Sequence, residues 1–293
     1  MTRPKNHSMN HPTRPAVPPA ADVAFVELPW DGRLVRIEYR LIEPATVGRA
    51  APLMVFLHEG LGSVSMWRDF PDQLCAAAGL RGLVYSRPGY GRSTPRAPGE
   101  AWGPDFMHRQ AAQLLPALLP ALGVHAQGDP PWLFGHSDGG SIALLYAAAP
   151  VRPLAGVVVM APHIVVETVS IDSIERARQA YAQGELRQRL SRHHDEPDSA
   201  FCGWAGAWLS PAFRHWSITD EIGSIRCPLL ALQGSEDEYG TLEQILGIAR
   251  RVPQAELLEL AGCGHSPHRE QPQLVIDAVA GFVQRHRRAA AQP

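Results

Sequence analysis

Charged residues are scarce in this sequence, and neither sign dominates. Asp, Glu, Lys and Arg make up 19% of the 293 residues, the formal net charge is −2, and the pI is about 6.7. This balance predicts no nucleic-acid or membrane-surface partner. No apolar run approaches the ~18 residues of a membrane span, whereas a 45% hydrophobic content can build a sizeable core.

Cysteine is also rare, and its spacing does not indicate a metal site. Cys75, Cys202, Cys227 and Cys263 form neither a CxxC pair nor a zinc-type pattern. We therefore expect free thiols, a reducing cytoplasmic location and no bound metal. Cys263 lies two residues before a histidine of interest, and we interpret it as a small packing residue rather than a second nucleophile.

The first 22 residues are basic and proline-rich and lack the apolar core of a signal peptide. We predict that residues 1–22 form a disordered tail. His7 and His11 then belong to this tail rather than to a metal site.

Short apolar runs alternate with helical patterns along the remaining chain, which predicts a mainly parallel sheet with helices on both faces. The expected strands are Ala24–Leu28, Leu34–Ile42, Pro52–Leu57, Gly82–Ser86, Trp132–Phe134, Leu154–Met160, Pro228–Gln233 and Glu256–Leu260, eight in all. The expected core helices are Ser65–Ala78, Pro104–Leu122 (kinked or shortened by Pro116 and Pro120), Asp138–Ala149, Leu242–Arg250 and Gln271–Arg285.

The stretch 163–225 interrupts this alternation, because it is helical, polar and rich in tryptophan. We interpret it as a cap inserted into one core domain, which then comprises residues 23–162 and 226–287.

The segment Gly135-His136-Ser137-Asp138-Gly139 matches G-x-S-x-G, the nucleophile elbow. It joins an apolar strand to an apolar helix with almost no loop. Side chains at the two glycines would collide with the neighbouring strand and helix. The helix N-terminus directs backbone N–H groups at developing negative charge. The bland alternative is a Ser-Gly turn that merely reverses the chain or grips a phosphate.

A serine nucleophile needs a base, and His265 is the best-placed histidine. It lies in "GCGHSPHREQP", between the last strand and the C-terminal helix. That loop is at the carboxyl end of the sheet, where the elbow also opens. His268 is the rival, which we expect to pack near the helix start, and His136 should point elsewhere.

The imidazole in turn needs a carboxylate to orient it. Asp237 follows a strand in "LLALQGSEDEYG", flanked by Glu236 and Glu238, which we expect to be solvated. The order Ser137, Asp237, His265 is the one expected for an elbow-bearing sheet.

At this point the sequence resembles the α/β-hydrolase superfamily over roughly residues 25–285. Besides the elbow and the acid and histidine loops, "FLHEGLGS" resembles the family's His-Gly oxyanion loop and "YSRPGYGRS" its D-x-x-G-x-G-x-S turn. The likeness is closest to small capped members that hydrolyse esters, thioesters, lactones or activated C–C bonds. It implies the fold, a Ser-His-Asp triad, a cap and no cofactor.

Two positions depart from the family pattern. Glu59 replaces the first glycine after the histidine, so Gly60 is expected to supply one oxyanion N–H with that of Asp138, and Leu61 is the fallback. Ser86 replaces the usual aspartate and removes a charge from a structural turn. Arg87 remains, and we hypothesise that it pairs with Glu59 or Asp138, whose charges would otherwise oppose an oxyanion. Alternatively, Glu59 points to solvent or caps a helix.

The cap carries Trp204 and Trp208 one helical turn apart, followed by Phe213 and Trp216. These side chains either wall a pocket for an acyl group or attach the cap to the core, and we expect at least half to do the latter. The tentative substrate-binding set is Glu59, Leu61, His136, Trp204 and Trp208.

The favoured function is a serine hydrolase that cleaves a small carboxylic ester through an acyl-enzyme. C–C bond or thioester cleavage on the same triad is the alternative, and a non-catalytic binding protein is a third reading. The expected partner is a small ester-like molecule, and a homodimer is the assembly considered.

Overall fold

The computed structural model describes residues 23–124, 129–149 and 153–290. The prediction of a disordered tail concerns residues outside these ranges. Eight strands form one sheet in the order β1-β2-β4-β3-β5-β6-β7-β8. Their bounds are β1 Ala24–Trp30, β2 Arg33–Ile42, β3 Leu53–Leu57, β4 Arg81–Tyr85, β5 Trp132–His136, β6 Gly156–Met160, β7 Leu229–Gly234 and β8 Ala255–Leu260.

Strand β2 is antiparallel to both β1 and β4, and every other neighbouring pair is parallel. The predicted eight-stranded, mostly parallel sheet is therefore confirmed. The parallel pairs bring the carboxyl ends of β5, β7 and β8 to one edge, and the loops that follow them meet there.

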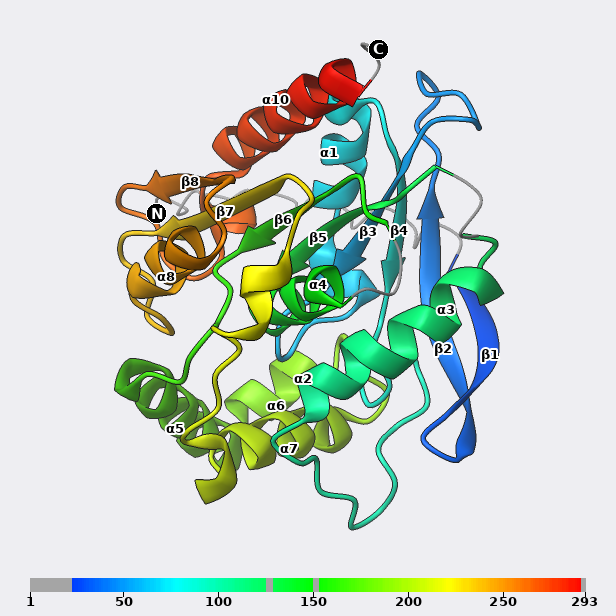
Figure 1. Cartoon of the computed structure of the whole chain (residues 1–293). Coiled ribbons are helices and arrows are strands. Elements are labelled where there is room, and N and C mark those ends of the chain that lie inside the picture. Colours follow the sequence, from blue (N-terminus) through cyan, green and yellow to red (C-terminus); the bar gives the residue numbers. More distant parts are fainter. Residues whose placement is uncertain (1–22, 125–128, 150–152, 291–293) are drawn as a thin grey trace, which may run out of the picture.

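Helices cover both faces of the sheet (Figure 1). The core helices are α1 Phe70–Ala78, α2 Phe106–Arg109, α3 Leu115–Ala121, α4 Asp138–Ala148, α8 Glu243–Arg251, α9 Pro267–Glu270 and α10 Pro272–Ala290. Alternate residues of β3 explain the two layers: Val55 and Leu57 join the core with α3 and α4, whereas Met54 and Phe56 join the core with α1 and α10.

Two predicted helices are interrupted. In the predicted helix 104–122, α2 and α3 are joined by a π-helical turn, η2 (Gln110–Leu114), and Pro116 and Pro120 both lie in α3. In the predicted helix 65–78, the 3₁₀ helix η1 (Val64–Trp67) is separated from α1 by Arg68, whose φ is 55°. A residue in that region ends a right-handed helix.

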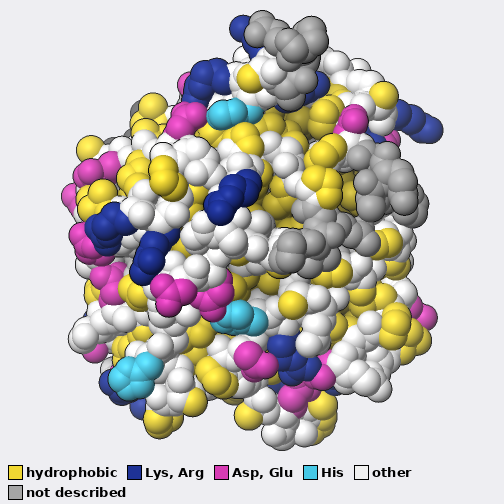
Figure 2. All heavy atoms as spheres, viewed as in Figure 1, with side chains coloured by type: hydrophobic (Ala, Val, Ile, Leu, Met, Phe, Trp, Pro, Cys, Tyr) yellow, Lys and Arg dark blue, Asp and Glu magenta, His cyan; other side chains and the backbone are white. Residues whose placement is uncertain are grey.

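The segment between β6 and β7 carries α5 (Thr168–Ala182), α6 (Glu185–Leu190), α7 (Pro197–Trp208) and two 3₁₀ turns, η3 (Pro211–Phe213) and η4 (Glu221–Ser224). Helices α5, α6 and α7 lie together beside the sheet (Figure 1). In Figure 2, charged side chains of both signs are interspersed with hydrophobic ones on the visible face, in keeping with the small net charge. Among the described residues, no helix is both long and apolar enough to cross a membrane.

Candidate active site

The turn between β5 and α4 has the geometry of a nucleophile elbow. Ser137 adopts φ 53° and ψ −120°, a conformation that costs energy for a residue with a side chain. A Cβ added to Gly135 would lie 2.2 Å from the Gly139 oxygen, and one added to Gly139 would lie 2.1 Å from the Leu57 oxygen. Both glycines are thus sterically required, as the sequence pattern predicts.

Three loops bring Ser137, His265 and Asp237 into one hydrogen-bonded chain. His265 Nε2 lies 3.0 Å from Ser137 Oγ, and His265 Nδ1 lies 2.8 Å from Asp237 Oδ1. The same carboxylate accepts hydrogen bonds from the backbone N–H of Tyr239 and Gly240 at 2.8 and 3.2 Å. These two donors hold the Asp237 carboxylate in the orientation in which it contacts the imidazole.

In the pair of Asp237 and His265, each residue favours the charged form of the other, which opposes the effect of burial. Burial alone would raise the pKa of Asp237, but the His265 ring outweighs it and the pKa is lowered. Burial alone would lower the pKa of His265, but the Asp237 carboxylate outweighs it and the pKa is raised above 6.5. The arrangement therefore stabilises an imidazolium beside the serine.

The rival residues lie elsewhere. His268 is buried and packs against the Trp67 and Phe70 rings, at centroid distances of 5.2 and 5.4 Å. Glu236 is exposed. Glu238 is exposed too, but it lies at the cavity and accepts a hydrogen bond from the backbone N–H of His265 at 3.1 Å. Cys263 is buried in the core with α1 and α10.

The loop expected to supply an oxyanion donor follows β3, and its peptide between Glu59 and Gly60 has a fixed orientation. The Glu59 carbonyl oxygen accepts from His58 Nδ1 at 2.7 Å, Arg87 Nη2 at 2.8 Å and the Gly62 N–H at 3.0 Å. In a trans peptide the C=O and the following N–H point in opposite directions. The Gly60 N–H therefore points away from these three donors.

The tautomer of His58 agrees with this arrangement. Burial, assisted by the Arg87 charge, lowers its pKa well below 6.5, so the ring is neutral. Its Nε2 accepts from the Arg87 backbone N–H at 3.0 Å, which leaves Nδ1 as the donor to the Glu59 carbonyl.

The hypothesis that Arg87 pairs with Glu59 or Asp138 is confirmed for Asp138. Arg87 Nη2 lies 3.7 Å from Asp138 Oδ2, but it contacts only the backbone carbonyl of Glu59. The Glu59 carboxylate turns instead toward His136 and Arg269, at 3.6 and 3.4 Å, with its side chain 16% exposed. It neither extends into solvent nor caps a helix.

Ser86, the second departure, has a partner that the sequence did not reveal. Ser86 Oγ donates to Glu38 Oε2 at 2.7 Å and accepts from the Val64 N–H at 2.9 Å. The same Glu38 oxygen accepts from the Arg92 N–H at 2.9 Å. Glu38, on β2, thus supplies a carboxylate to a turn whose own aspartate is replaced by serine.

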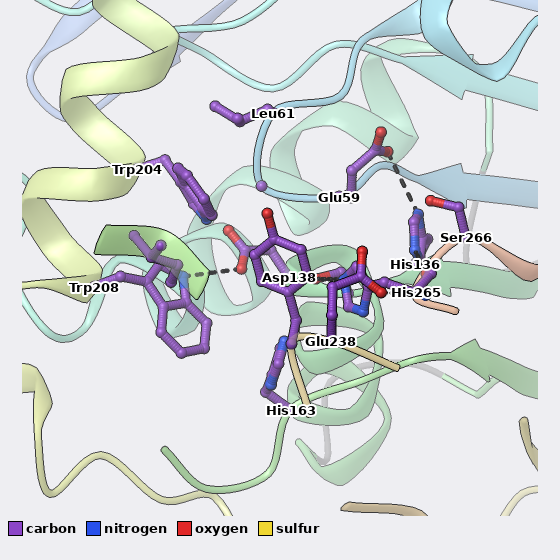
Figure 3. Close-up of a pocket in the computed structure, with 14 residues that line it drawn as sticks. Glu59, Leu61, His136, Asp138, His163, Trp204, Trp208, Glu238, His265 and Ser266 are labelled. Carbon is purple, nitrogen blue, oxygen red and sulfur yellow. Dashed lines mark hydrogen bonds and ion pairs between the residues drawn. The ribbon is translucent and has the colours of Figure 1, made fainter. Parts of the chain in front are cut away.

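A cavity of about 240 Å³ opens over Ser137 (Figure 3). All five tentative substrate-binding residues line it. The full lining is Glu59, Gly60, Leu61, His136, Ser137, Asp138, His163, Ile174, Trp204, Trp208, Glu238, Tyr239, His265 and Ser266.

His163 and Tyr239 are lining residues that sequence reasoning missed. Burial and the neighbouring His265 lower the pKa of His163 to about 3, so this ring is neutral. Its ring centroid lies 4.9 Å from that of Trp208. Both residues follow strand ends, β6 and β7, and that position is the one signal that could have indicated them.

The cap tryptophans both line the cavity and join the cap to the core. The Trp204 indole packs on Gly60 so closely that a Cβ there would lie 2.1 Å from Nε1. Trp208 Nε1 donates to Asp138 Oδ1 at 3.1 Å. Phe213 packs edge to face against Trp208 and stacks on Trp216, and neither Phe213 nor Trp216 lines the cavity. We expected at least half of this cluster to attach the cap to the core.

A sequence model of the alpha/beta hydrolase family matches residues 54–278, more than half of the chain, and the protein belongs to that family. It is 25% identical over 286 residues to the sn-1-specific diacylglycerol lipase ABHD11 of Mus musculus, covering 86% of this chain and 87% of the relative.

Solved structures show the same fold. A carboxylesterase structure from the thaumarchaeon Nitrososphaera gargenis has a TM-score of 0.69 and 19% identity, covering 90% of this chain and 99% of that one. The enol-lactonase of Burkholderia xenovorans LB400 has a TM-score of 0.68 and 19% identity, covering 88% and 99%. The protein is thus a hydrolase by family.

Proposed function

We propose that this hydrolase cleaves small, uncharged carboxylic esters through an acyl-enzyme on Ser137. The observation that carries the proposal is the chain of hydrogen bonds from Asp237 through His265 to a strained serine that faces a cavity. The ester-cleaving names of the relatives, a lipase and a carboxylesterase, support it.

In the first half-reaction, Ser137 Oγ attacks the ester carbonyl while His265 Nε2 takes its proton. The N–H groups of Gly60 and Asp138 hold the developing oxyanion, and each such donor is worth ~10²–10³ in turnover. His265 then protonates the leaving alcohol. In the second half-reaction, His265 deprotonates a water that hydrolyses the acyl-enzyme and returns the proton to Ser137.

The cavity supports a compact, uncharged acyl group. Its volume of about 240 Å³ is below the ~300–1,000 Å³ common for pockets that take drug-sized ligands. The lining residues include Glu59 and Glu238 but neither lysine nor arginine, so the described wall offers no cationic side chain to a substrate carboxylate or to CoA phosphates.

A substrate panel tests the proposal, with Ser137→Ala as the blank. We expect p-nitrophenyl acetate and butyrate to be hydrolysed faster than the octanoate, and much faster than acetyl-CoA or a vinylogous diketone. Ser137→Ala should lose roughly 10⁴–10⁶ in kcat. A fluorophosphonate probe should label Ser137, and an unlabelled wild-type protein would favour the non-catalytic binding reading.

A further inference from the structure

The Glu59 carboxylate, at a position where the family pattern has glycine, contacts the loops that carry Ser137 and His265. Its Oε2 is 3.6 Å from Nδ1 of His136, the residue before the nucleophile. Its Oε1 is 3.4 Å from Nη2 of Arg269, four residues after His265. Glu59 itself precedes the Gly60 N–H, so one residue links the loops that carry the proposed oxyanion donor, nucleophile and base. Figure 3 shows its contact with His136.

The contact with His136 extends to the base. His136 is buried, and its Nε2 lies 2.8 Å from the His265 carbonyl oxygen. Oxygen atoms of Glu59 and His265 therefore face both of its ring nitrogens. Glu59 thus reaches the His265 backbone through a single ring.

The contact of Glu59 with Arg269 holds the C-terminal end of the loop that carries His265. Arg269 Nη2 also donates to the Met66 carbonyl at 3.2 Å, which ties α9 to η1. Space for the carboxylate is provided at Gly62, where a Cβ would lie 2.3 Å from Glu59 Oε2. The absence of a side chain at Gly62 therefore leaves the space that this carboxylate occupies.

The charge of Glu59 is stabilised where it lies. Burial alone would raise its pKa, but the neighbouring His136 and then the charge of Arg269 hold that pKa well below the ordinary value of 4.5. Glu59 is thus ionised throughout the neutral range, so a neutral isostere removes the charge without removing the volume.

We propose that Glu59 is a positioning residue that holds the oxyanion N–H, Ser137 and His265 in mutual register. This inference rests on the serine-hydrolase function proposed above and adds a residue specific to this chain. Its effect should fall on rate rather than on folding, because the Glu59–Arg269 pair is partly exposed and such pairs add little to stability, whereas small misplacements of reacting groups cost up to ~10²-fold in rate.

The test compares Glu59→Gln with Glu236→Gln, which makes the same chemical change on an exposed side chain of the Asp237 loop. For Glu59→Gln we expect kcat on p-nitrophenyl acetate to fall roughly ten- to a hundred-fold with KM within about two-fold. The rate of Ser137 labelling by a fluorophosphonate should fall in parallel. The Ki of a trifluoromethyl ketone, which occupies the oxyanion site, should increase by the same factor by which kcat/KM falls. Glu236→Gln should change none of these.

A double variant shows whether Arg269 acts through the same carboxylate. Once Glu59→Gln is present, adding Arg269→Gln should slow the enzyme little further, because coupled residues are not additive.

Three outcomes overturn the inference. The first is a Glu59→Gln enzyme whose kcat, labelling rate and Ki stay within about two-fold of the wild type. The second is a loss explained by a smaller folded fraction, with an unchanged labelling rate for the molecules that remain folded. The third, failure of the probe to label Ser137 in the wild type, sinks the proposed function as well, and so the two failures are distinguishable.

Discussion

The elbow side and the oxyanion-loop side of the cavity each place a carboxylate next to a proposed oxyanion donor, and they treat it in opposite ways. On the elbow side, burial raises the pKa of Asp138 above 3.8, against the opposing pull of Arg87 and the Trp208 hydrogen bond. On the loop side, His136 and Arg269 lower the pKa of Glu59 despite its burial. Asp138 is therefore harder to ionise than a free aspartate, whereas Glu59 is ionised and lies beside His136 and Arg269.

The comparison shows two ways of keeping negative charge from opposing an oxyanion. The elbow relies on burial and on a rigid backbone that Gly135 and Gly139 allow. The oxyanion loop relies on cross-loop ion pairs and on a glycine whose neighbour is a cap side chain. Substitutions on the elbow side should therefore lower the stability of the fold, whereas substitutions on the oxyanion-loop side should lower the catalytic rate.

Gly139→Ala should produce the largest effect, because its Cβ would meet the Leu57 backbone oxygen at 2.1 Å and no side chain can move aside. We expect a loss of stability beyond the ~1–3 kcal/mol of ordinary overpacking, measured as the urea midpoint. Gly206→Ala is the matched control: this residue of α7 has no atom within 4 Å of its added Cβ. It should be neutral or gain ~0.5–1 kcal/mol. Equal midpoints for the two variants would refute a rigid elbow.

Gly60→Ala should come next, and its damage should be to rate. The added Cβ overlaps the Trp204 indole, so the loop must shift, and we expect kcat/KM to fall by up to ~10²–10³, the value of one oxyanion donor. Replacing Trp204 by Ala in the same protein should recover part of the rate. If it recovers none, the indole is not what holds the loop.

The pH dependence of kcat/KM tests the charge assigned to Glu59. His265 must be neutral to act as base, so kcat/KM should fall as the pH drops through its pKa, which lies above 6.5. Asp237 is the largest contributor that raises this pKa, and Glu59 is a smaller one. Glu59→Gln should therefore move the acidic limb to lower pH, by less than Asp237→Asn does. An upward shift would contradict the assigned charge of Glu59.

Asp138→Asn should produce the smallest effect. Because the folded protein holds the Asp138 proton more tightly than the unfolded chain, wild-type stability falls as pH rises from 3.8 toward the folded pKa. Asparagine cannot ionise, yet its oxygen still accepts from Trp208. At pH 7 we expect a Tm about 2–4 °C higher, the shift that ~1 kcal/mol produces in a chain of this size. The gain should vanish toward pH 4 in calorimetry, and a lower Tm at pH 7 would show that pairing with Arg87 outweighs burial.

Much of the fold could be predicted from local patterns. The central strands β3 to β7 are short apolar runs buried on both faces, whereas β1, β2 and β8 expose part of their residues. Such apolar runs can be found without knowledge of distant contacts. The elbow could be found because its glycines are required by backbone crowding within a few residues. His265 and Asp237 follow from position, since loops after parallel strands meet at one edge.

What could not be predicted depends on contacts between distant segments. The partner of Ser86 is Glu38, 48 residues away, and that of Glu59 is Arg269, 210 residues away. Nothing local distinguishes these side chains from solvated ones. Helix breaks at Arg68 and at the π-helical turn likewise reflect packing that propensity does not encode.

The cap is fastened to the loop that carries Asp237 by two hydroxyl groups of α5, since Ser170 Oγ donates to the Tyr239 carbonyl at 2.5 Å and Ser173 Oγ to the Glu238 carbonyl. A foreign lid grafted between β6 and β7 would therefore arrive without these two anchors, and the acid could drift from its imidazole even with every core residue intact. Anyone exchanging lids to alter selectivity should transplant the serines along with the helices.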